Sequence, residues 1–204
     1  LFLVTETDIE QRQRQGIKRT LIVIVCFITV VFGLFVNRLS MDRILNPKEL
    51  VANGAIMFSS PREIGEFNLV DHNKSAFTKQ QLQGQWSLIF FGFTHCPDIC
   101  PTTLAMMNEL NEFLSDTPYA EDTQFLMVSL DPARDTPIKL KPYIEYFNSD
   151  FIGVTGEFLS IHRFAKQFNV AFQKVVTNAE TGDYTVDHSG HIAVVNPAGQ
   201  NSGI

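Results

Sequence analysis

The stretch FFGFTHCPDICPTT, from Phe90 to Thr103, decides the fold of this chain and holds two of its three cysteines, Cys96 and Cys100. A mainly apolar run, WSLIFFGF over 86–93, leads into the cysteines. Its length and bulky side chains predict a strand that is buried on both faces. The cysteines therefore follow the end of a buried strand.

The residues after the cysteines predict a helix over 102–114, because apolar side chains recur there near one face. Pro101 suits the first helical position, where a missing N–H costs nothing. We thus expect Cys96 and Cys100 in a loop between strand and helix. Free N–H groups and the positive end of the helix dipole favour a thiolate at such a place.

Two neighbouring cysteines also have an ordinary explanation, a structural disulfide. A disulfide between Cys96 and Cys100 would close a very short ring and so stabilise the fold little. Three cysteines in 204 residues also argue against a disulfide scaffold. Two thiols at a strand–helix junction are better suited to reversible oxidation, soft-metal binding or both.

Composition limits the class of protein. The chain is 45% hydrophobic and 19% charged, with a formal net charge of −6. These values fit one globular domain with a short appendage. An acidic balance, with no cluster of lysine and arginine on the domain, argues against nucleic acid as a partner.

An uncharged apolar run over 20–37 is close to the ~17–25 residues that a membrane-spanning helix needs. A cleaved signal peptide is less favoured, because no good small-residue cleavage site follows the run. Positive charges before it predict a cytoplasmic N-terminus. The expected organisation is a cytoplasmic tail over 1–19, a transmembrane anchor over 20–37, a tether over 38–63 and the domain over 64–204. Cys26, inside the anchor, is expected to be only a small apolar residue.

The rest of the domain alternates between strand and helix patterns. A hairpin over 66–78 comes first, with His72 expected to be solvated in its turn. Further strands are predicted over 123–130, 151–155, 169–176, 182–186 and 191–195, and further helices over 138–147 and 157–168. This alternation predicts a mixed α/β sheet with helices on both faces.

A histidine is the third candidate group. His188 lies between two predicted strands and His191 opens the second of them, so one of the two is expected near the top of the sheet. Two thiolates with one imidazole suit Cu(I) and also hold Cu(II). Zinc would need a fourth ligand or water, for which Asp98 or Asp131 has a carboxylate.

Three segments carry a resemblance to a known family: FGFTHCPDICPTTL, SLDPARDTP and VDHSGHIAVVNPAG. Together, within about residues 60–199, they resemble the Sco/SenC family of copper-delivery proteins for cytochrome c oxidase assembly. The resemblance implies a thioredoxin-like fold and copper, Cu(I) or Cu(II), bound by Cys96, Cys100 and His188. His191 is then a strand residue.

The same resemblance implies partners and a place in the cell. It implies a single-pass inner-membrane protein whose domain faces the periplasm, or the mitochondrial intermembrane space in a eukaryote. Cytochrome c oxidase subunit II would receive the copper at its binuclear centre, and other copper chaperones are expected as partners. Copper delivery is not an enzymatic reaction, so an enzyme activity is not the first expectation.

A thiol–disulfide oxidoreductase that keeps the oxidase cysteines reduced is the alternative, with Cys96 and Cys100 as its redox pair. A dedicated thioredoxin would have two residues between its cysteines and a proline opening the later strand. This chain has three residues between them and the sequence Ser-Gly-His over 189–191. A peroxiredoxin-type peroxidase is disfavoured further, because no arginine is marked as the partner of a single reactive cysteine.

Other candidates have simpler explanations. His95 alternates away from its neighbouring cysteine and is not expected to be a ligand. Asp98 either tunes thiolate basicity or is a solvated loop acid. The remaining expectations are helix capping by Asp131 and Asp135, and core positions for Met106 and Met107.

The C-terminal end prompts one more expectation. The turn Asn-Pro-Ala-Gly over 196–199 should lead into another strand and a closing helix, and we expect both to be missing from this chain. The strand over 191–195 would then keep an open edge. On this basis residues 47–204 alone are expected to be unstable or to aggregate.

Overall fold

The computed structural model describes residues 6–39 and 45–204, with side chains described for 14–38 and 45–204. The chain divides into two compact units, residues 1–46 and 47–204. The parts of the predicted tail and tether over 1–5 and 40–44 lie outside the described residues.

The first unit contains one long helix, α1 (Glu6–Leu39). Its segment Arg14–Arg38 is long and apolar enough to cross a membrane, judged by length and composition. At about 1.5 Å per residue, these 25 residues exceed the roughly 30 Å of a bilayer core. The apolar side chains of this segment are exposed, as a lipid-facing helix requires.

The second unit is built on an eight-stranded sheet with the strand order β1-β10-β9-β4-β5-β6-β2-β3. At its centre β4, β5 and β6 run parallel, while β9 pairs antiparallel with β4. The strands are β1 (Met57–Glu63), β2 (Asn68–Asp71), β3 (Ala76–Thr78), β4 (Trp86–Gly92), β5 (Thr123–Ser129), β6 (Ile152–Thr155), β9 (Ile192–Val195) and β10 (Gln200–Gly203).

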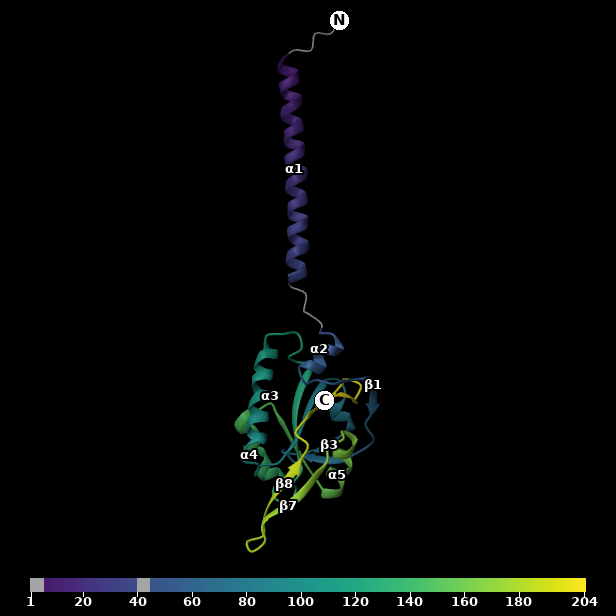
Figure 1. Cartoon of the computed structure of the whole chain (residues 1–204), viewed down its shortest axis with the longest axis vertical. Coiled ribbons are helices and arrows are strands. Elements are labelled where there is room, and N and C mark those ends of the chain that lie inside the picture. The colour runs from purple at the N-terminus through teal and green to yellow at the C-terminus, as the bar shows by residue number, and fades with distance from the viewer. Residues whose placement is uncertain (1–5, 40–44) are drawn as a thin grey trace. The chain divides into compact units, whose positions relative to one another are not determined.

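Helices cover both faces of this sheet. The helical elements of this unit are α2 (Pro47–Ala52), the 3-10 turn η1 (Lys79–Leu82), α3 (Ile99–Ser115), α4 (Pro137–Phe147) and α5 (Phe158–Gln167). In Figure 1, α3 and α4 lie on one side of the sheet and α5 on the other. A separate two-stranded sheet is formed by β7 (Phe172–Asn178) and β8 (Asp183–His188).

Alternation along β4 explains why its sequence is apolar almost throughout. The Phe91 ring packs against Phe164 and Phe168 of α5, with centroids 6.0 and 5.4 Å apart. Its neighbours Phe90 and Gly92 face the other way, where a Cβ added to Gly92 would lie 3.0 Å from the Cys100 sulfur. Both faces of β4 are therefore covered by helices, which confirms the predicted buried strand.

The helix after the cysteines begins earlier than predicted. It starts at Ile99 rather than Thr102, so Cys100 lies in its first turn and only Cys96 lies in the loop. Pro101 is tolerated there because the first-turn N–H groups have no partner within the helix. The backbone of Thr102 donates to the Asp98 carbonyl at 3.3 Å and closes this turn.

The predicted open edge at the C-terminal end is wrong. Residues 200–203 form β10, which pairs antiparallel with β9 on one side and with β1 on the other. The Asn196 side chain accepts hydrogen bonds from the Ala198 and Gln200 N–H groups at 3.1 and 3.0 Å and shapes the turn. Pattern analysis missed β10 because Gln-Asn-Ser-Gly has low strand propensity. An open edge of β9 is therefore no longer a reason to expect residues 47–204 to be unstable.

Two other expectations also differ from the structure. Residues 57–63, predicted as part of the tether, are strand β1 at one edge of the sheet. His72, predicted to be solvated, is only 7% exposed. The Nδ1 atom of His72 accepts a hydrogen bond from the Gly153 N–H at 2.9 Å, and the backbone N–H of His72 donates to the Gly153 carbonyl. This histidine therefore fastens the β2–β3 turn to β6.

The aromatic packing around α5 is expected to carry much of the domain's stability. Phe164 is fully buried, with ring centroids 4.3 Å from Phe67 and 5.0 Å from Phe168. Phe164→Ala should lower the free energy of unfolding by about 3–5 kcal/mol. Urea unfolding of the full chain in detergent measures this. Phe113→Ala is the control, since Phe113 is 73% exposed, and equal losses in both variants would contradict the assignment of this core.

Candidate metal centre

The two thiols of the opening motif are neighbours at the junction of β4 and α3. The Cys100 N–H donates to the Cys96 sulfur at 3.4 Å, and both side chains are buried and not joined in a disulfide. Gly92, at the end of β4, leaves room for the Cys100 sulfur, since a Cβ there would lie 3.0 Å from it. The backbone therefore packs closely against the buried thiol.

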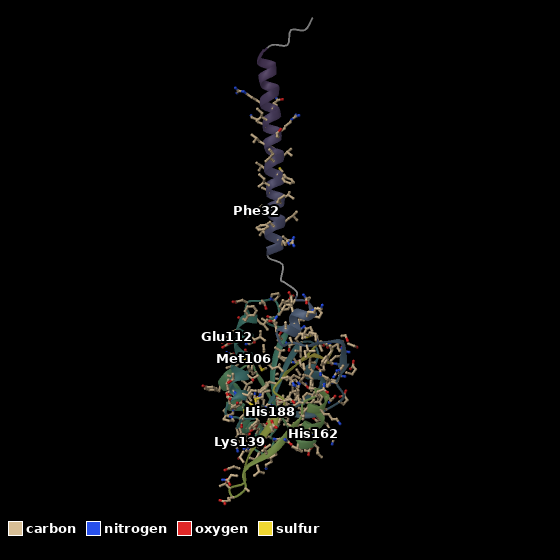
Figure 2. All side chains as sticks on the ribbon, viewed as in Figure 1. Phe32, Met106, Glu112, Lys139, His162 and His188 are labelled. Atoms are coloured by element: carbon tan, nitrogen blue, oxygen red, sulfur yellow. The ribbon has the colours of Figure 1, made fainter. Side chains whose placement is uncertain are left out.

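His188 lies beside these thiols although it is 88 residues away in sequence. Its Nε2 is 3.9 Å from the Cys100 sulfur, and the rings of Phe90 and Phe93 contact the imidazole edge-on. Its Nδ1 is 3.0 Å from the Ser189 carbonyl oxygen. A carbonyl only accepts, so Nδ1 carries the proton and the Nε2 lone pair is free to bind a metal. Figure 2 shows the place of His188 in the domain.

The three side chains are close, but they do not enclose a metal position. Within residues 14–38 and 45–204, no three His, Cys, Asp or Glu side chains already converge as a complete metal site. Of the two histidines expected near the top of the sheet, His188 is the one that lies beside Cys100.

Burial outweighs the helix dipole at the second thiol. Burial raises the pKa of Cys100 well above its ordinary value, and the hydrogen bond with Cys96 raises it further. A backbone hydrogen bond from Phe93 acts in the opposite direction but is weaker. In the metal-free protein Cys100 is therefore a protonated thiol, whereas its position at a helix N-terminus alone predicted a thiolate.

This pKa has a consequence for stability. Below the ordinary thiol pKa of about 8.5, both folded and unfolded chains hold the Cys100 proton. Above it the unfolded chain releases the proton first, so stability is lost as the pH rises, by about 1.4 kcal/mol per pH unit. Urea unfolding of the reduced, metal-free chain between pH 8 and 10 measures this slope. Cys100→Ser should remove that part of the slope, and parallel profiles for the two proteins would contradict the pKa assignment.

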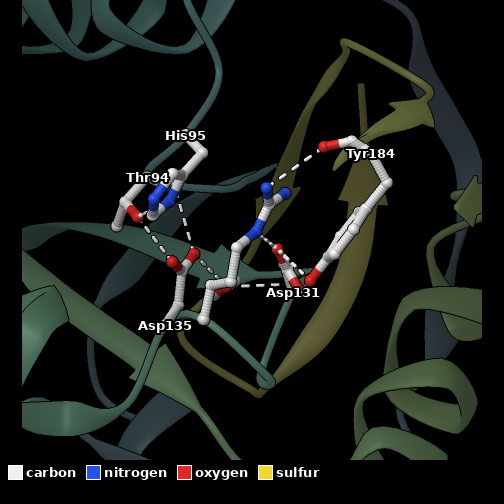
Figure 3. A network of polar contacts seen from close by, with 7 residues as sticks. Thr94, His95, Asp131, Asp135 and Tyr184 are labelled. Carbon is white, nitrogen blue, oxygen red and sulfur yellow. Dashed lines mark hydrogen bonds and ion pairs between the residues drawn. The ribbon is translucent and has the colours of Figure 1, made fainter. Parts of the chain in front are cut away.

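Asp135 connects the cysteine loop to the end of β5 (Figure 3). Its fully buried carboxylate accepts hydrogen bonds from the Thr94 N–H at 2.9 Å, the Thr94 hydroxyl at 2.5 Å and the Ser129 hydroxyl at 2.6 Å. The predicted capping role is wrong, because the next helix is capped at Thr136 and without a side-chain bond. Asp135 instead holds the backbone two residues before Cys96.

Asp131 begins the loop 131–135, which follows β5, and its side chain contacts the β7–β8 hairpin. Its carboxylate pairs with Arg134 and accepts a hydrogen bond from the Tyr184 hydroxyl at 2.9 Å. Arg134 also donates from Nη1 to the Tyr184 carbonyl at 3.1 Å. The carboxylate therefore neither caps the helix nor remains free as a fourth metal ligand. Sequence reasoning missed Arg134 and Tyr184, although a lone arginine between two aspartates was a signal.

The lesser candidates lie outside this group. His95 is exposed, with Nδ1 3.0 Å from the Thr94 hydroxyl oxygen, and the Nε2 of His191 is 3.1 Å from the Phe168 carbonyl oxygen. Asp98 is exposed at the start of α3. Met107 is buried as predicted, but the core prediction for Met106 is wrong, since it is 60% exposed.

This combination defines a class of protein: a thioredoxin-like α/β domain with a dithiol at a strand–helix junction and an imidazole beside it. The model of the SCO1/SenC family matches residues 58–204, and the chain belongs to this family. The resemblance noted in the sequence is thereby confirmed.

Similar proteins and solved structures support this assignment. The chain is 34% identical to a SCO2-like protein of Rickettsia conorii, over 90% of this chain and 89% of that one. The copper-bound structure of ScoI from Bradyrhizobium japonicum is 36% identical, with a TM-score of 0.63 over 69% of this chain and 87% of that one. BsSco, described as a member of the Sco family of cytochrome c oxidase assembly proteins with a disulfide switch, is 27% identical. Its TM-score is 0.55, over 72% of this chain and 84% of that one.

Proposed function

We propose that this chain is a membrane-anchored copper chaperone that helps to assemble the binuclear copper centre of cytochrome c oxidase. Cys96, Cys100 and His188 are the proposed copper ligands. The observation that carries the proposal is the 3.9 Å approach of His188 Nε2 to the Cys100 sulfur across 88 residues of sequence. The copper-bound relative and the family of oxidase assembly proteins support it.

The chemistry of these ligands suits copper cargo. Two sulfurs and one imidazole form a soft donor set that binds Cu(I) and also holds Cu(II). The hydrogen bond from Nδ1 to the Ser189 carbonyl fixes the ring and leaves Nε2 as the ligand atom. Such a donor set of three leaves copper open to a ligand from another protein, which permits direct transfer.

The surroundings of His188 support transfer to a partner. A hollow of about 460 Å³ opens beside it and is lined by a short set of residues: Ala171, Phe172, Gln173, Asp187, His188 and Ser189. The cysteines, in contrast, are buried. Ligands of a receiving protein therefore have their approach on the histidine side. We propose subunit II of the oxidase as the receiver and other copper chaperones as the source.

Copper binding at this site is coupled to protons. The raised pKa of Cys100 means that its thiol must lose a proton when it binds copper. Copper affinity should therefore increase with pH in the neutral range. A partner that donates copper to this site also needs a base, or bulk water, to take that proton.

The apolar segment of α1 supports a proposal for the place of this chain in the cell. We propose that residues 20–37 anchor the chain in the inner membrane, with residues 1–19 in the cytoplasm. The copper-binding domain then faces the periplasm, or the intermembrane space of a mitochondrion. The length and apolar composition of the segment Arg14–Arg38 support the anchor, and the positive charges before the span support the orientation.

A thiol–disulfide oxidoreductase that keeps the oxidase cysteines reduced is the second candidate. The contact between the Cys100 N–H and the Cys96 sulfur favours it, because the two thiols are placed for oxidation to a disulfide. The disulfide switch described for BsSco supports the same chemistry. Cys96 would attack the partner's disulfide and form a mixed disulfide with it. The buried Cys100, after losing its proton, would then attack the Cys96 sulfur, so that the partner leaves reduced and the Cys96–Cys100 disulfide forms.

The test of the copper site compares two histidine variants. The reduced full chain in detergent should bind one Cu(I), measured by competition with a chromogenic Cu(I) chelator. His188→Ala should weaken binding by at least about tenfold, as loss of a ligand exceeds loss of an outer contact. His95→Ala, next to Cys96 but exposed, should bind as the wild type does.

Thiol oxidation in the same variants separates the two functions. His188→Ala should still form the Cys96–Cys100 disulfide when it is titrated against a glutathione buffer. Unchanged copper affinity in His188→Ala would remove this residue from the site and favour the oxidoreductase. Loss of copper binding in Cys96→Ser and Cys100→Ser alone would then mark a dithiol site without the imidazole.

A further inference from the structure

The hairpin that carries His188 is not part of the main sheet. Its strands, β7 and β8, pair with each other and form a sheet of their own (Figure 1). No ladder of backbone hydrogen bonds in the described residues joins this hairpin to β4 or β9. The position of the imidazole relative to the thiols therefore depends on the three-residue link 189–191 to β9 and on side-chain contacts of the hairpin.

Tyr184, near the end of β8 that is farther from the thiols, lies on the same face of the strand as His188. Side chains two residues apart share one face of a strand, so Tyr184, Val186 and His188 lie in a row. Val186 is buried, and Tyr184 and His188 are half-buried. Tyr184 lies about 13 Å along the strand from His188 at about 3.3 Å per residue. A contact that holds Tyr184 therefore also fixes the orientation of strand β8, and with it the position of His188.

Tyr184 makes three kinds of contact with the loop 131–134. Its hydroxyl donates to the two oxygens of Asp131 at 2.9 and 3.2 Å, and its carbonyl accepts from Arg134 at 3.1 Å. The guanidinium of Arg134 also lies 3.8 Å from the ring centroid, and the Lys174 ammonium lies 3.5 Å from it. Burial and the Asp131 hydrogen bond raise the pKa of the Tyr184 phenol, so its hydroxyl remains a donor.

The same loop holds the cysteine side of the site. Four residues after Asp131, the carboxylate of Asp135 accepts both the N–H and the hydroxyl of Thr94. In Figure 3, dashed lines join Asp135 to Thr94 and Asp131 to Tyr184. The loop 131–135 is thus a bridge between the segment that carries Cys96 and the strand that carries His188.

We propose that Tyr184 and Arg134 are positioning residues, which lock the β7–β8 hairpin onto the loop 131–135 and so hold His188 at the distance from Cys100 that copper binding needs. Neither residue touches the metal. The inference rests on the proposed copper function, and it adds a second group of residues, outside the ligands, that sets the copper affinity. Releasing the lock would move the imidazole while both thiols stay in place.

Two conservative variants test whether the contacts of Tyr184 and Arg134 position His188. Tyr184→Phe keeps the ring under Arg134 but removes the hydroxyl that binds Asp131. Arg134→Lys keeps the charge near Asp131 but loses the planar fork that reaches the Tyr184 carbonyl. Each should weaken Cu(I) binding by the full chain by no more than about tenfold, the lower end of outer-shell effects, because the imidazole is displaced and not removed. Tyr146→Phe, which removes a hydroxyl from an 83% exposed tyrosine of α4, is the matched control and should bind as the wild type does.

A double-mutant cycle distinguishes positioning from general destabilisation. If Tyr184 acts through His188, Tyr184→Phe should have almost no further effect on copper affinity in a His188→Ala background. An equal loss in both backgrounds would show a merely structural role and overturn the proposal. Wild-type affinity in both Tyr184→Phe and Arg134→Lys would overturn it as well.

A measurement without copper keeps the two proposals separate. Hydrogen exchange of the metal-free full chain should show faster exchange of the β7 and β8 amides in Tyr184→Phe than in Tyr146→Phe. If the wild type bound no copper, the copper function would fail, and this experiment would still test the lock. Unchanged exchange in the hairpin would then overturn the lock itself.

Discussion

A carboxylate that is buried without donors costs several kcal/mol, so the three hydrogen bonds accepted by Asp135 are a constraint that its neighbours must meet. They come from the N–H and hydroxyl of Thr94 and from the hydroxyl of Ser129. Ser129 ends β5, Thr94 follows β4, and the two strands run parallel side by side. The loop before Cys96 is thereby fixed to the carboxyl ends of the two central strands. This contact therefore helps to keep the cysteine loop in place.

The three side chains of the candidate site come from elements that are held in place to different extents. Cys100 belongs to a helix packed on the central sheet, and Cys96 to a loop held through Asp135. His188 belongs to a two-stranded hairpin outside the sheet. A protein that binds copper and releases it needs ligands that are well placed but separable, and this division suits that need. At the proposed site the buried thiols would retain the metal, while the imidazole lies at a hollow that a partner could enter.

Competition between burial and the helix dipole also shapes the chemistry. A thiol in the first turn of a helix is expected to be acidic, and that expectation was reasonable from sequence. In the folded chain, the Cys100 sulfur is buried close to Gly92 at the end of β4, and burial raises its pKa. The resting protein therefore avoids a buried negative charge. The charge appears only when a cation arrives to balance it, which couples copper binding to proton release.

Local patterns in the sequence determined the buried strand β4, the helices after it and the position of the dithiol, because continuous apolar runs and helical spacing reflect burial directly. Family-specific segments, rather than spacing, pointed to His188. Tertiary structure alone decided how these parts meet. Strand β10 forms from Gln-Asn-Ser-Gly because β9 and β1 offer backbone partners on both sides, not because of its own propensity. His72 is buried because β6 receives it, and Asp131 and Asp135 bind Tyr184 and Thr94 instead of capping a helix. Such long-range contacts leave no periodic signal in the chain, since each depends on the position of a distant partner.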